Sequence, residues 1–404
     1  MEKTDNKIKK ALLTTTVSGF VPQFEMNNVK ILQQMGYEVH YASNFNNISY
    51  GFDNHRLDGT GIVRHQIDYT RSPFQIKENI IAYKQLKKVL EEESFSLLHC
   101  HTPVAAVLAR LAVKLNHKTE TKVVYTAHGF HFYKGASLKY WVFFYTIERF
   151  LASFTDVLIT INKEDYKRAK QFCKLKKTKV KYIPGVGIDT VYWNGTELKP
   201  EEKRQIRLKT RESLGLTEQE VAFVSVGELI PRKNHSEVIK VLASIVQERE
   251  NLQLRPFHYY ICGQGDLREE LEQLIKKEKM ENYITLLGYQ EDARIVLFGM
   301  DAFLFPSLQE GLPVAMLEAA TVGLPIIARN VRGNRDVVNF INANSQTKIK
   351  RNHLFSSSKE LKHYLISILK EDKPIDFEKN NMVNFDAKII QKKMKKIYSD
   401  LLDS

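Results

Sequence analysis

The stretch S-L-Q-E-G-L-P-V-A-M-L-E-A-A-T-V-G-L-P-I-I-A-R, residues 307–329, decides the fold of the second half of the chain. It follows an apolar run at 302–305 that is typical of a buried strand, and a turn with Gly and Pro leads into a helical pattern from about Pro313. Gly323 ends this pattern, and residues 325–328 form a second apolar run. The stretch therefore predicts a strand, a loop, a helix and another strand.

Two glutamates lie on this unit, Glu310 in the loop and Glu318 inside the helix, with seven residues between them. A proline at the first helical position is tolerated because its missing amide hydrogen has no partner there in any case. The amides of Leu312 and Val314 are then among the free donors at a helix start, where the helix dipole favours phosphate. Since phosphate would repel a carboxylate, we expect the glutamates to accept hydrogen bonds from sugar and ribose hydroxyls beside it.

The spacing of Glu310 and Glu318 resembles the E-x7-E signature of retaining nucleotide-sugar glycosyltransferases of family four, which have the GT-B fold. The surrounding L-F-P-S-L-Q-E-G-L-P extends the resemblance, which covers nearly the whole chain. It implies that Glu310 orients the donor sugar and that Glu318 binds the ribose. The words H-T-P-V-A-A-V-L-A-R and A-H-G-F-H-F-Y-K-G-A look closest to bacterial capsule and exopolysaccharide transferases, whose acceptors are often undecaprenyl-diphosphate-linked sugars.

The composition suits a globular protein of two domains, with 404 residues, 43% apolar and 26% charged. The first ten residues do not resemble a signal peptide, and no apolar run reaches the ~18 residues that span a bilayer. Three dispersed cysteines, Cys100, Cys173 and Cys262, suggest reduced thiols in a cytoplasmic protein.

The positive charge is concentrated in the first half. Residues 1–183 carry 28 Lys and Arg against 16 Asp and Glu, whereas the rest carries 32 against 31. This excess either keeps the surface solvated or forms a face for anionic lipid or a lipid-linked diphosphate, peripheral on the inner face of the cell membrane. A nucleic-acid partner is not expected, because no recognition module or zinc spacing occurs.

Short β-rich runs alternate with helical patterns in both halves, which predicts parallel sheets covered on both faces. The predicted strands are 10–17, 38–42, 95–99, 122–126, 156–161, 221–226, 258–262, 284–287 and the two of the opening stretch, with one weak strand somewhere in 44–70. The predicted helices begin near Gln23, Pro103, Leu138, Glu164, Lys233, Asp266 and Glu291, and two more span 359–369 and 386–402.

Glycines and a proline within 183–193 indicate a hinge. We therefore predict an α/β protein of GT-B type, with two doubly wound Rossmann-like domains facing a central cleft. The N-terminal acceptor-binding domain spans 1–183, and the C-terminal nucleotide-sugar-binding domain spans 184–380. The resemblance implies that a helix at 381–404 crosses back to the N-terminal domain.

Adjacent cations, Arg232 and Lys233, lie between a predicted strand end and a helix start. A departing diphosphate is stabilised by a metal or by fixed cations, and no D-x-D metal motif occurs, so we predict a metal-independent reaction without a cofactor. A solvated basic turn is the alternative. The segment resembles the G-R-L…K-G motif of the family, which implies donor binding by Gly227 and the cations. Glu228 stands where many members have arginine, so whether Arg232 takes both roles stays open.

His128 follows a strand and precedes a glycine that permits close backbone approach. His128 is either an ordinary hydrogen-bonded histidine or, as the resemblance implies, a catalytic residue beside the donor sugar. His131 is a weaker rival for that role.

Gly19 is either a turn glycine or, by resemblance, the place where the diphosphate lies on the backbone. His99 and His101 are expected on one face of their strand and Cys100 on the other, which makes a shared metal site awkward.

Gly263 and Gly265 suggest a dinucleotide fingerprint, but Arg268 replaces its third glycine, so a tight turn near the nucleotide is the better interpretation. The resemblance places base binding at Tyr289, although packing is equally compatible. Residues 130–154, rich in aromatic rings and with lysines, are either a core helix or an interfacial surface for a lipid-linked acceptor.

Together these features predict a retaining, metal-independent glycosyltransferase that moves a sugar from a UDP-sugar to a growing glycan. The resemblance favours an N-acetylhexosamine donor and a polyprenyl-diphosphate-linked acceptor in capsule or exopolysaccharide biosynthesis. Two alternatives are a catalytically silent GT-B subunit and a nucleotide-sugar epimerase, for which we find no acid-base carboxylates.

Overall fold

The computed structural model describes residues 8–51, 53–116, 120–248, 252–345, 351–371 and 380–403. The chain forms two compact units, unit 1 (Met1–Gly187 and Ala387–Ser404) and unit 2 (Ile188–Asp386). These boundaries fall a few residues after those drawn from the sequence. Most of the segment inspected for a signal peptide lies outside the described residues.

Unit 1 is built on a parallel sheet of seven strands in the order β3-β2-β1-β4-β5-β6-β7. The strands are β1 (Lys10–Thr14), β2 (Glu38–Ser43), β3 (Val63–Gln66), β4 (Phe95–Cys100), β5 (Lys122–Ala127), β6 (Val157–Thr160) and β7 (Lys179–Tyr182). The weak strand expected in 44–70 is β3. The edge strand β7 was not predicted, because its half-exposed K-V-K-Y sequence lacks the apolar run of a buried strand.

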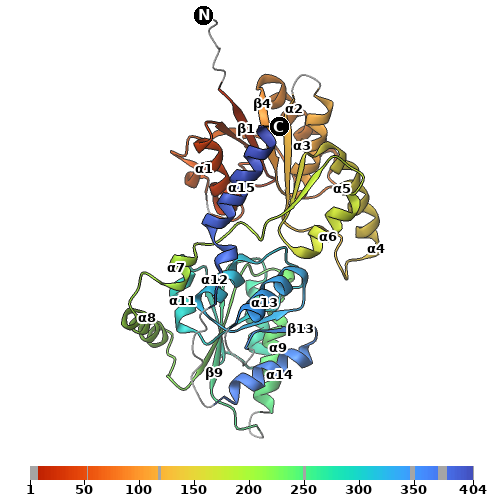
Figure 1. Cartoon of the computed structure of the whole chain (residues 1–404). Helices are drawn as coiled ribbons and strands as arrows, with labels where there is room; N and C mark the ends of the chain where they lie inside the picture. Colours follow the sequence, from red (N-terminus) through yellow and green to blue (C-terminus); the bar gives the residue numbers. More distant parts are fainter. Residues whose placement is uncertain are drawn as a thin grey trace, which may run out of the picture. The chain divides into compact units, whose positions relative to one another are not determined.

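Helices cover both faces of this sheet. They are η1 (Val21–Glu25, a π-helical turn), α1 (Met26–Gln34), η2 (His55–Leu57), α2 (Ile76–Glu92), α3 (Pro103–Leu115), α4 (Leu138–Tyr140), η3 (Trp141–Tyr145, also π-helical), α5 (Thr146–Leu151), η4 (Ala152–Phe154), α6 (Lys163–Phe172) and α15 (Ala387–Leu402). The helix expected from Gln23 thus begins earlier, as a π-helical turn. The C-terminal helix α15 lies beside α1 (Figure 1) and buries Ile390, Met394 and Tyr398 in the same core as Leu13.

Unit 2 has a parallel sheet of six strands in the order β10-β9-β8-β11-β12-β13. The strands are β8 (Val221–Val226), β9 (Phe257–Cys262), β10 (Ile284–Gly288), β11 (Ala302–Phe305), β12 (Ile326–Arg329) and β13 (His353–Phe355). The helices are α7 (Thr190–Asn194), α8 (Pro200–Ser213), η5 (Pro231–Lys233), α9 (His235–Gln247), α10 (Arg268–Lys277), α11 (Ala293–Gly299), α12 (Val314–Val322), α13 (Arg332–Asn344), α14 (Ser358–Leu369) and η7 (Val383–Phe385). The sequence analysis missed α7, α8, α13 and β13 in this unit, and α2 in unit 1.

The stretch at 307–329 folds as predicted, with two shifts. Helix α12 begins at Val314, because Pro313 has an extended ψ of 113° and stands before the helix, not at its first position. Gly323 ends the helix with a φ of +104°, and the Leu324 N–H donates to the Ala319 carbonyl at 3.1 Å. A left-handed residue at this place favours glycine, since it has no Cβ to clash. The following strand β12 begins one residue later than expected.

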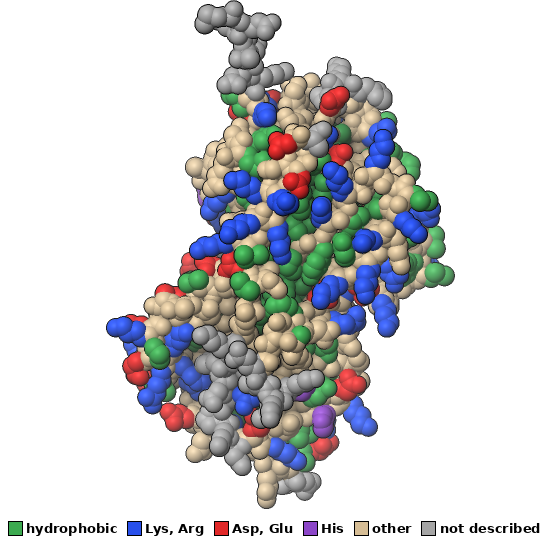
Figure 2. All heavy atoms as spheres, viewed as in Figure 1, with side chains coloured by type: hydrophobic (Ala, Val, Ile, Leu, Met, Phe, Trp, Pro, Cys, Tyr) green, Lys and Arg blue, Asp and Glu red, His purple; other side chains and the backbone are tan. Residues whose placement is uncertain are grey.

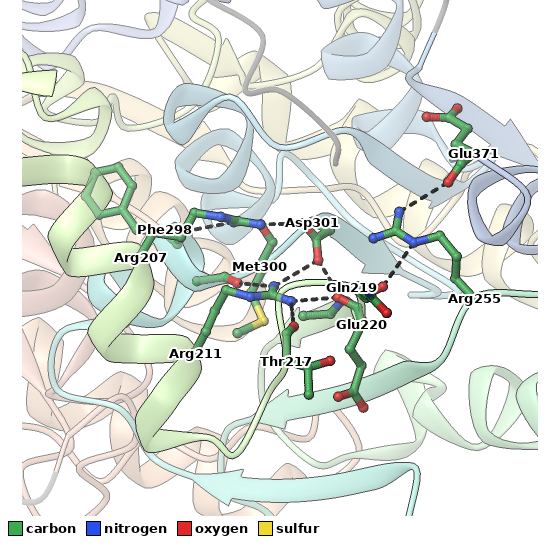
Figure 3. A network of polar contacts seen from close by, with 12 residues as sticks. Arg207, Arg211, Thr217, Gln219, Glu220, Arg255, Phe298, Met300, Asp301 and Glu371 are labelled. Atoms are coloured by element: carbon green, nitrogen blue, oxygen red, sulfur yellow. Dashed lines mark hydrogen bonds and ion pairs between the residues drawn. The ribbon is translucent and has the colours of Figure 1, made fainter. Parts of the chain in front are cut away.

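A buried carboxylate attaches α8 to the sheet of unit 2 (Figure 3). Asp301, directly before β11, accepts hydrogen bonds from Arg207 Nη2 at 2.6 Å and Arg211 Nη1 at 3.1 Å, both from α8. Its Oδ2 also accepts from the Ala222 N–H at 2.7 Å, at the start of β8. A charged, poorly amphipathic helix is therefore held by ion pairs more than by an apolar stripe, which explains why its periodicity gave no prediction.

Both sheets are wound outward in two directions from a central pair of strands, β1 and β4 in unit 1 and β8 and β11 in unit 2. In such sheets, ligands bind at the carboxyl ends of the two strands where the winding direction changes. The loops that leave these four strands carry most of the residues singled out from the sequence.

Candidate functional site

In unit 2, the loops after β8 and β11 bring two cations onto one carboxylate. Lys233 Nζ and Arg232 Nη1 lie 2.8 and 2.9 Å from Glu310 Oε1, and Arg232 Nη1 also donates to the Gln309 carbonyl at 2.9 Å. The Leu308 N–H donates to the Arg232 carbonyl at 2.9 Å, so the two loops are bound to each other. Both cations lie between the end of β8 and the start of α9, as predicted, but in the 3-10 turn η5, and α9 begins at His235, two residues later than expected.

Glu310 is ionised in this arrangement. Burial raises the pKa of its carboxyl, but the charges of Lys233 and Arg232 outweigh that effect and hold the pKa below its ordinary value. Lys233 Nζ also lies 4.9 Å from the centre of the Phe305 ring, which helps to fix it. Two cations facing one anion leave net positive charge for an incoming diphosphate.

Sequence reasoning missed a third arginine beside this cluster. Arg332, the buried first residue of α13, donates from Nε to the backbone carbonyl of Glu310 at 3.0 Å. The next residue, Gly333, lies so close to the loop that a Cβ would be 2.3 Å from the Gly311 carbonyl oxygen. Because α13 was not recognised in the sequence, no pattern pointed to either residue.

The glycines after β8 and β9 permit a close approach of two loops. A Cβ on Gly263 would lie 1.8 Å from the Gly227 carbonyl oxygen, and one on Gly265 would lie 2.5 Å from the Leu229 carbonyl oxygen. Their φ angles of +149° and +158° favour glycine in addition. A turn does begin at Gly265, whose carbonyl accepts from the Arg268 N–H at 3.2 Å, while its expected place near the nucleotide stays a prediction. The two glycines let this segment pack against the loop that carries the cations.

The other predicted donor contacts lie around this loop. Leu312 is buried and Val314 half-buried at the start of α12, while Tyr289 is exposed directly after β10. Glu318 is half-buried about one turn further along α12, and burial raises the pKa of its carboxyl to about 7.

The pKa of Glu318 gives a testable pH dependence. Below pH 4.5 this carboxyl is protonated in both the folded and the unfolded chain, whereas between pH 4.5 and 7 the unfolded chain releases the proton first. Glu318 therefore lowers stability as pH rises through this window, by up to about 3 kcal/mol. We expect Glu318→Gln to remove that part of the decline, measured by urea unfolding at pH 5 and pH 8. An unchanged difference between the two pH values would contradict the assigned pKa.

In unit 1, three side chains meet at the carboxyl edge of the sheet. His101 Nδ1 lies 3.1 Å from His128 Nε2, and Glu25 Oε1 lies 3.5 Å from each of these nitrogens. Burial raises the pKa of Glu25 to about 8 and lowers that of His128 to about 4, and it depresses the pKa of His101 strongly. All three groups are therefore largely neutral at pH 7. The half-buried His128 also has its ring 4.9 Å from that of Phe20.

Glu25, His101 and His128 are also the group in the described part of the chain that could hold a metal ion, with ligand atoms within 4.8 Å of one another. Their separations resemble the ~3.4 Å between ligands around tetrahedral zinc. However, a metal-bound histidine normally donates its second ring N–H to a partner, and His101 Nε2 is buried without a hydrogen bond. The residues thus fit a metal only in part.

The end of β4, with His101 directly after it, confirms the expected alternation. The rings of His99 and His101 lie 4.1 Å apart, and His99 is held by Tyr398 at 2.7 Å and Thr126 at 2.8 Å. Cys100 points into the core on the opposite face. All three cysteines are buried and unpaired.

Gly19 and His131 have structural explanations of their own. A Cβ on Gly19 would lie 1.7 Å from the carbonyl oxygen of Ser49, so the close approach of two backbones already requires glycine there. His131 stacks on Phe144 with ring centres 4.5 Å apart. A role of Gly19 in donor binding stays a prediction, as does the catalytic role of His128.

Two Rossmann-like units, each with polar residues at the switch point of a parallel sheet, define the class of GT-B glycosyltransferases. Models of known families agree: "Glycosyltransferase Family 4" matches residues 27–191, and "Glycosyl transferases group 1" matches residues 206–383. The putative glycosyltransferase EpsD of Bacillus subtilis (strain 168) is 33% identical over 330 residues, which cover 82% of this chain and 81% of EpsD. The chain therefore belongs to the GT-B glycosyltransferases of the family-four type, as the resemblance implied.

Two further proteins are similar. The UDP-Gal:alpha-D-GlcNAc-diphosphoundecaprenol alpha-1,3-galactosyltransferase of Escherichia coli is 30% identical over 63% of this chain and 62% of its own length. The crystal structure of Anabaena Alr3699/HepE in complex with UDP and glucose superposes with a TM-score of 0.71 at 18% identity, covering 97% of this chain and all of HepE, which shows a shared fold. Among the described residues, no helix is both long and apolar enough to cross a membrane.

Proposed function

We propose that this glycosyltransferase moves a sugar from a UDP-sugar to a polyprenyl-diphosphate-linked glycan in capsule or exopolysaccharide biosynthesis. The observation that carries the proposal is the pairing of Arg232 and Lys233 with Glu310 at the switch point of unit 2. The named activity of the Escherichia coli relative, which uses UDP-Gal and a diphosphoundecaprenol acceptor, supports the donor and acceptor classes. The resemblance favours an N-acetylhexosamine as the transferred sugar.

In this proposal the cations receive the departing diphosphate. Arg232 and Lys233 neutralise the charge that develops as the bond between the anomeric carbon and the diphosphate oxygen breaks, without a metal. Glu310 is already ionised and accepts hydrogen bonds from the hydroxyls of the donor sugar. The donor phosphate oxygens share the cations with Glu310, so the cluster rearranges little when the donor binds.

Each of the remaining donor-binding residues contacts the part of the donor that was predicted for it. The amides of Leu312 and Val314 face the phosphate, Glu318 binds the ribose, and Tyr289 lies against the base. Gly227 leaves the backbone open to the diphosphate; within the protein, a Cβ there would make only an ordinary contact, 3.4 Å from Lys233 Cε. Glu318 accepts ribose hydrogen bonds better as a carboxylate, so donor binding lowers its raised pKa.

Transfer proceeds with retention by front-face displacement. The acceptor hydroxyl oxygen attacks the anomeric carbon on the side from which the diphosphate leaves, and its proton passes to a departing phosphate oxygen. His128, neutral at pH 7, donates or accepts a hydrogen bond at the donor sugar. No covalent intermediate on Glu310 is needed in this route.

A donor panel tests the proposal. The purified chain is incubated with UDP- and GDP-sugars and a polyprenyl-diphosphate-linked saccharide acceptor, released nucleotide is measured with and without EDTA, and the anomer of the glycosidic product is read by NMR. We expect UDP release from one donor, unaffected by EDTA, with retained configuration. Binding without turnover would instead indicate a silent subunit, isomerised donor an epimerase, and loss of activity in EDTA a metal, with Glu25, His101 and His128 as the first ligands to test.

We also propose a cytoplasmic protein that binds the inner face of the membrane through unit 1. Lys and Arg side chains are scattered over the face of unit 1 seen in Figure 2, where Asp and Glu side chains are fewer. Leu138, Val142 and Phe150 are exposed on the helix formed by α4, η3 and α5. We expect the chain to float with anionic vesicles and Leu138→Ser/Val142→Ser to float several-fold less. Leu175→Ser, at an exposed position elsewhere in unit 1, is the control. Equal flotation of all three proteins would exclude this surface.

A further inference from the structure

Unit 1 contains a cavity of about 720 Å³ between α2, α3 and the helix formed by η3 and α5. This volume lies in the range of cavities that bind drug-sized ligands. Strand β5 contributes Tyr125 to the lining, and the loop after β5 contributes Phe132. The helices contribute mainly aliphatic side chains, such as Val107 and Leu111. The cavity is therefore lined mostly by apolar groups, and nothing in the donor chemistry of unit 2 uses it.

The helices leave apolar side chains exposed along this cavity. Ile76 and Ile80 of α2 are 68% and 49% exposed, and Phe143 of η3 is 41% exposed, although all three line it. Phe74, just before α2, stacks on Phe143 with ring centres 5.8 Å apart, which joins the two walls at one edge. Concave, exposed apolar surfaces of this kind mark ligand-binding grooves.

One charged group in the wall, Glu148, is already neutralised. Glu148 accepts hydrogen bonds from Arg110 Nη1 at 2.9 Å and Nη2 at 3.3 Å, and from the Tyr125 hydroxyl at 3.2 Å. The Arg110 guanidinium also lies over the Tyr125 ring at 4.1 Å. Because these charges satisfy one another, the wall favours an occupant without polar groups. A peptide would bring backbone N–H and C=O groups that need partners.

One end of the cavity reaches the loops of the candidate site. Thr16, Phe20, Thr102 and Gly129 line it there, and the Phe20 ring lies 4.9 Å from that of His128. Thr102 has a φ of +53°, a strained conformation for this residue, and its hydroxyl lies 2.8 Å from that of Thr16. Strained residues of this kind concentrate at functional sites. The apolar part of the cavity thus continues into a polar end beside His128.

We propose that this cavity binds the first isoprene units of a polyprenyl-diphosphate acceptor, with the diphosphate at its polar end beside Arg71. This inference rests on the lipid-linked acceptor of the proposed function. The chemistry of the cavity carries it, because the apolar channel suits a hydrocarbon chain and the lining guanidinium of Arg71 can pair with an anionic head group. Arg71 lies toward the polar end, since its Nη2 donates to Ser49 Oγ at 2.5 Å. The ring of the next residue, Tyr50, lies 6.1 Å from that of Phe20. His128 lies just beyond the lining, where the attached sugar follows. The lipid then contributes acceptor affinity directly and does not serve only as a membrane anchor.

Equilibrium dialysis of the full chain with radiolabelled farnesyl diphosphate tests this site. Excess UDP is present throughout to occupy a diphosphate site in unit 2. We expect saturable binding at least tenfold tighter than that of inorganic diphosphate. Ile80→Asp, at an exposed position where folding tolerates the change, and Leu108→Trp, which fills the cavity, should each weaken binding at least tenfold. Leu175→Asp, 96% exposed outside the cavity, should bind like the wild type.

Farnesyl diphosphate that binds no tighter than diphosphate, or that binds Ile80→Asp and Leu108→Trp like the wild type, overturns the inference. The outcome is separable from that of the proposed function. Release of UDP from a donor with no farnesyl diphosphate binding would remove only the lipid site. Farnesyl diphosphate binding that both cavity variants lose, in a protein that turns over no donor, would keep the site and remove the transferase proposal.

Discussion

Glu310→Gln is expected to lower the rate of UDP release by about 100- to 1000-fold, the usual loss when a preorganised polar contact to the reacting group is removed. The amide keeps the shape of the side chain but cannot accept the strong, charge-assisted hydrogen bonds that a carboxylate takes from sugar hydroxyls. At the same time it no longer neutralises Lys233 and Arg232, whose distances to Glu310 are 2.8 and 2.9 Å. Affinity for UDP alone should therefore stay the same or rise.

A loss of turnover without a loss of UDP affinity would show that Glu310 contacts the donor sugar. A carboxylate with only a structural role would lower both. The measurement is UDP release from the donor found in the panel, with UDP affinity by calorimetry on the same preparations. Glu269→Gln, an exposed position on α10, is the matched control and should equal the wild type in both. A variant that loses UDP affinity and turnover by the same factor would show that Glu310 mainly holds the loop together.

The core elements of both sheets were predictable because their residues obey local rules. The apolar run of β11, the glycine end of α12 and the turn at Gly263 and Gly265 each depend on a few neighbouring residues, and the structure confirms them. The errors at Pro313 and Lys233 concern one or two residues at helix starts, where extended or 3-10 backbone replaces the first helical turn.

Other features depend on contacts between distant parts of the chain. Glu25 meets His101 and His128 only because η1, β4 and β5 end at the same edge of the sheet, and a glutamate in an apolar N-terminal segment gives no indication of such partners. Helix α8 was missed because its stability comes from ion pairs with residues about ninety positions away, which periodicity does not record. The cavity of unit 1 likewise needs three helices in place before its apolar lining becomes concave.

Asp301→Asn is expected to destabilise unit 2 by about 3–5 kcal/mol, the cost of leaving a buried charge without its partner. Arg211 is almost completely buried, and its guanidinium also donates to the carbonyls of Gly299, Thr217 and Glu220, at 3.0, 2.6 and 2.6 Å. These carbonyls satisfy its N–H groups but not its charge. Asn would also replace the carboxylate oxygen that accepts from the Ala222 N–H, which links the start of β8 to the same network.

Calorimetric unfolding with and without UDP measures this loss, because UDP should raise the transition temperature of unit 2, the donor-binding unit in the proposed function. Glu212→Gln, at an exposed position on α8, removes one negative charge from the same helix and should change stability by less than about 0.5 kcal/mol. The change at Asp301 should leave kcat nearly unaltered at temperatures where the variant is folded, because the network lies before β11 whereas Glu310 lies after it. Equal stability of Asp301→Asn and Glu212→Gln would mean that packing, and not this carboxylate, holds α8 on the sheet.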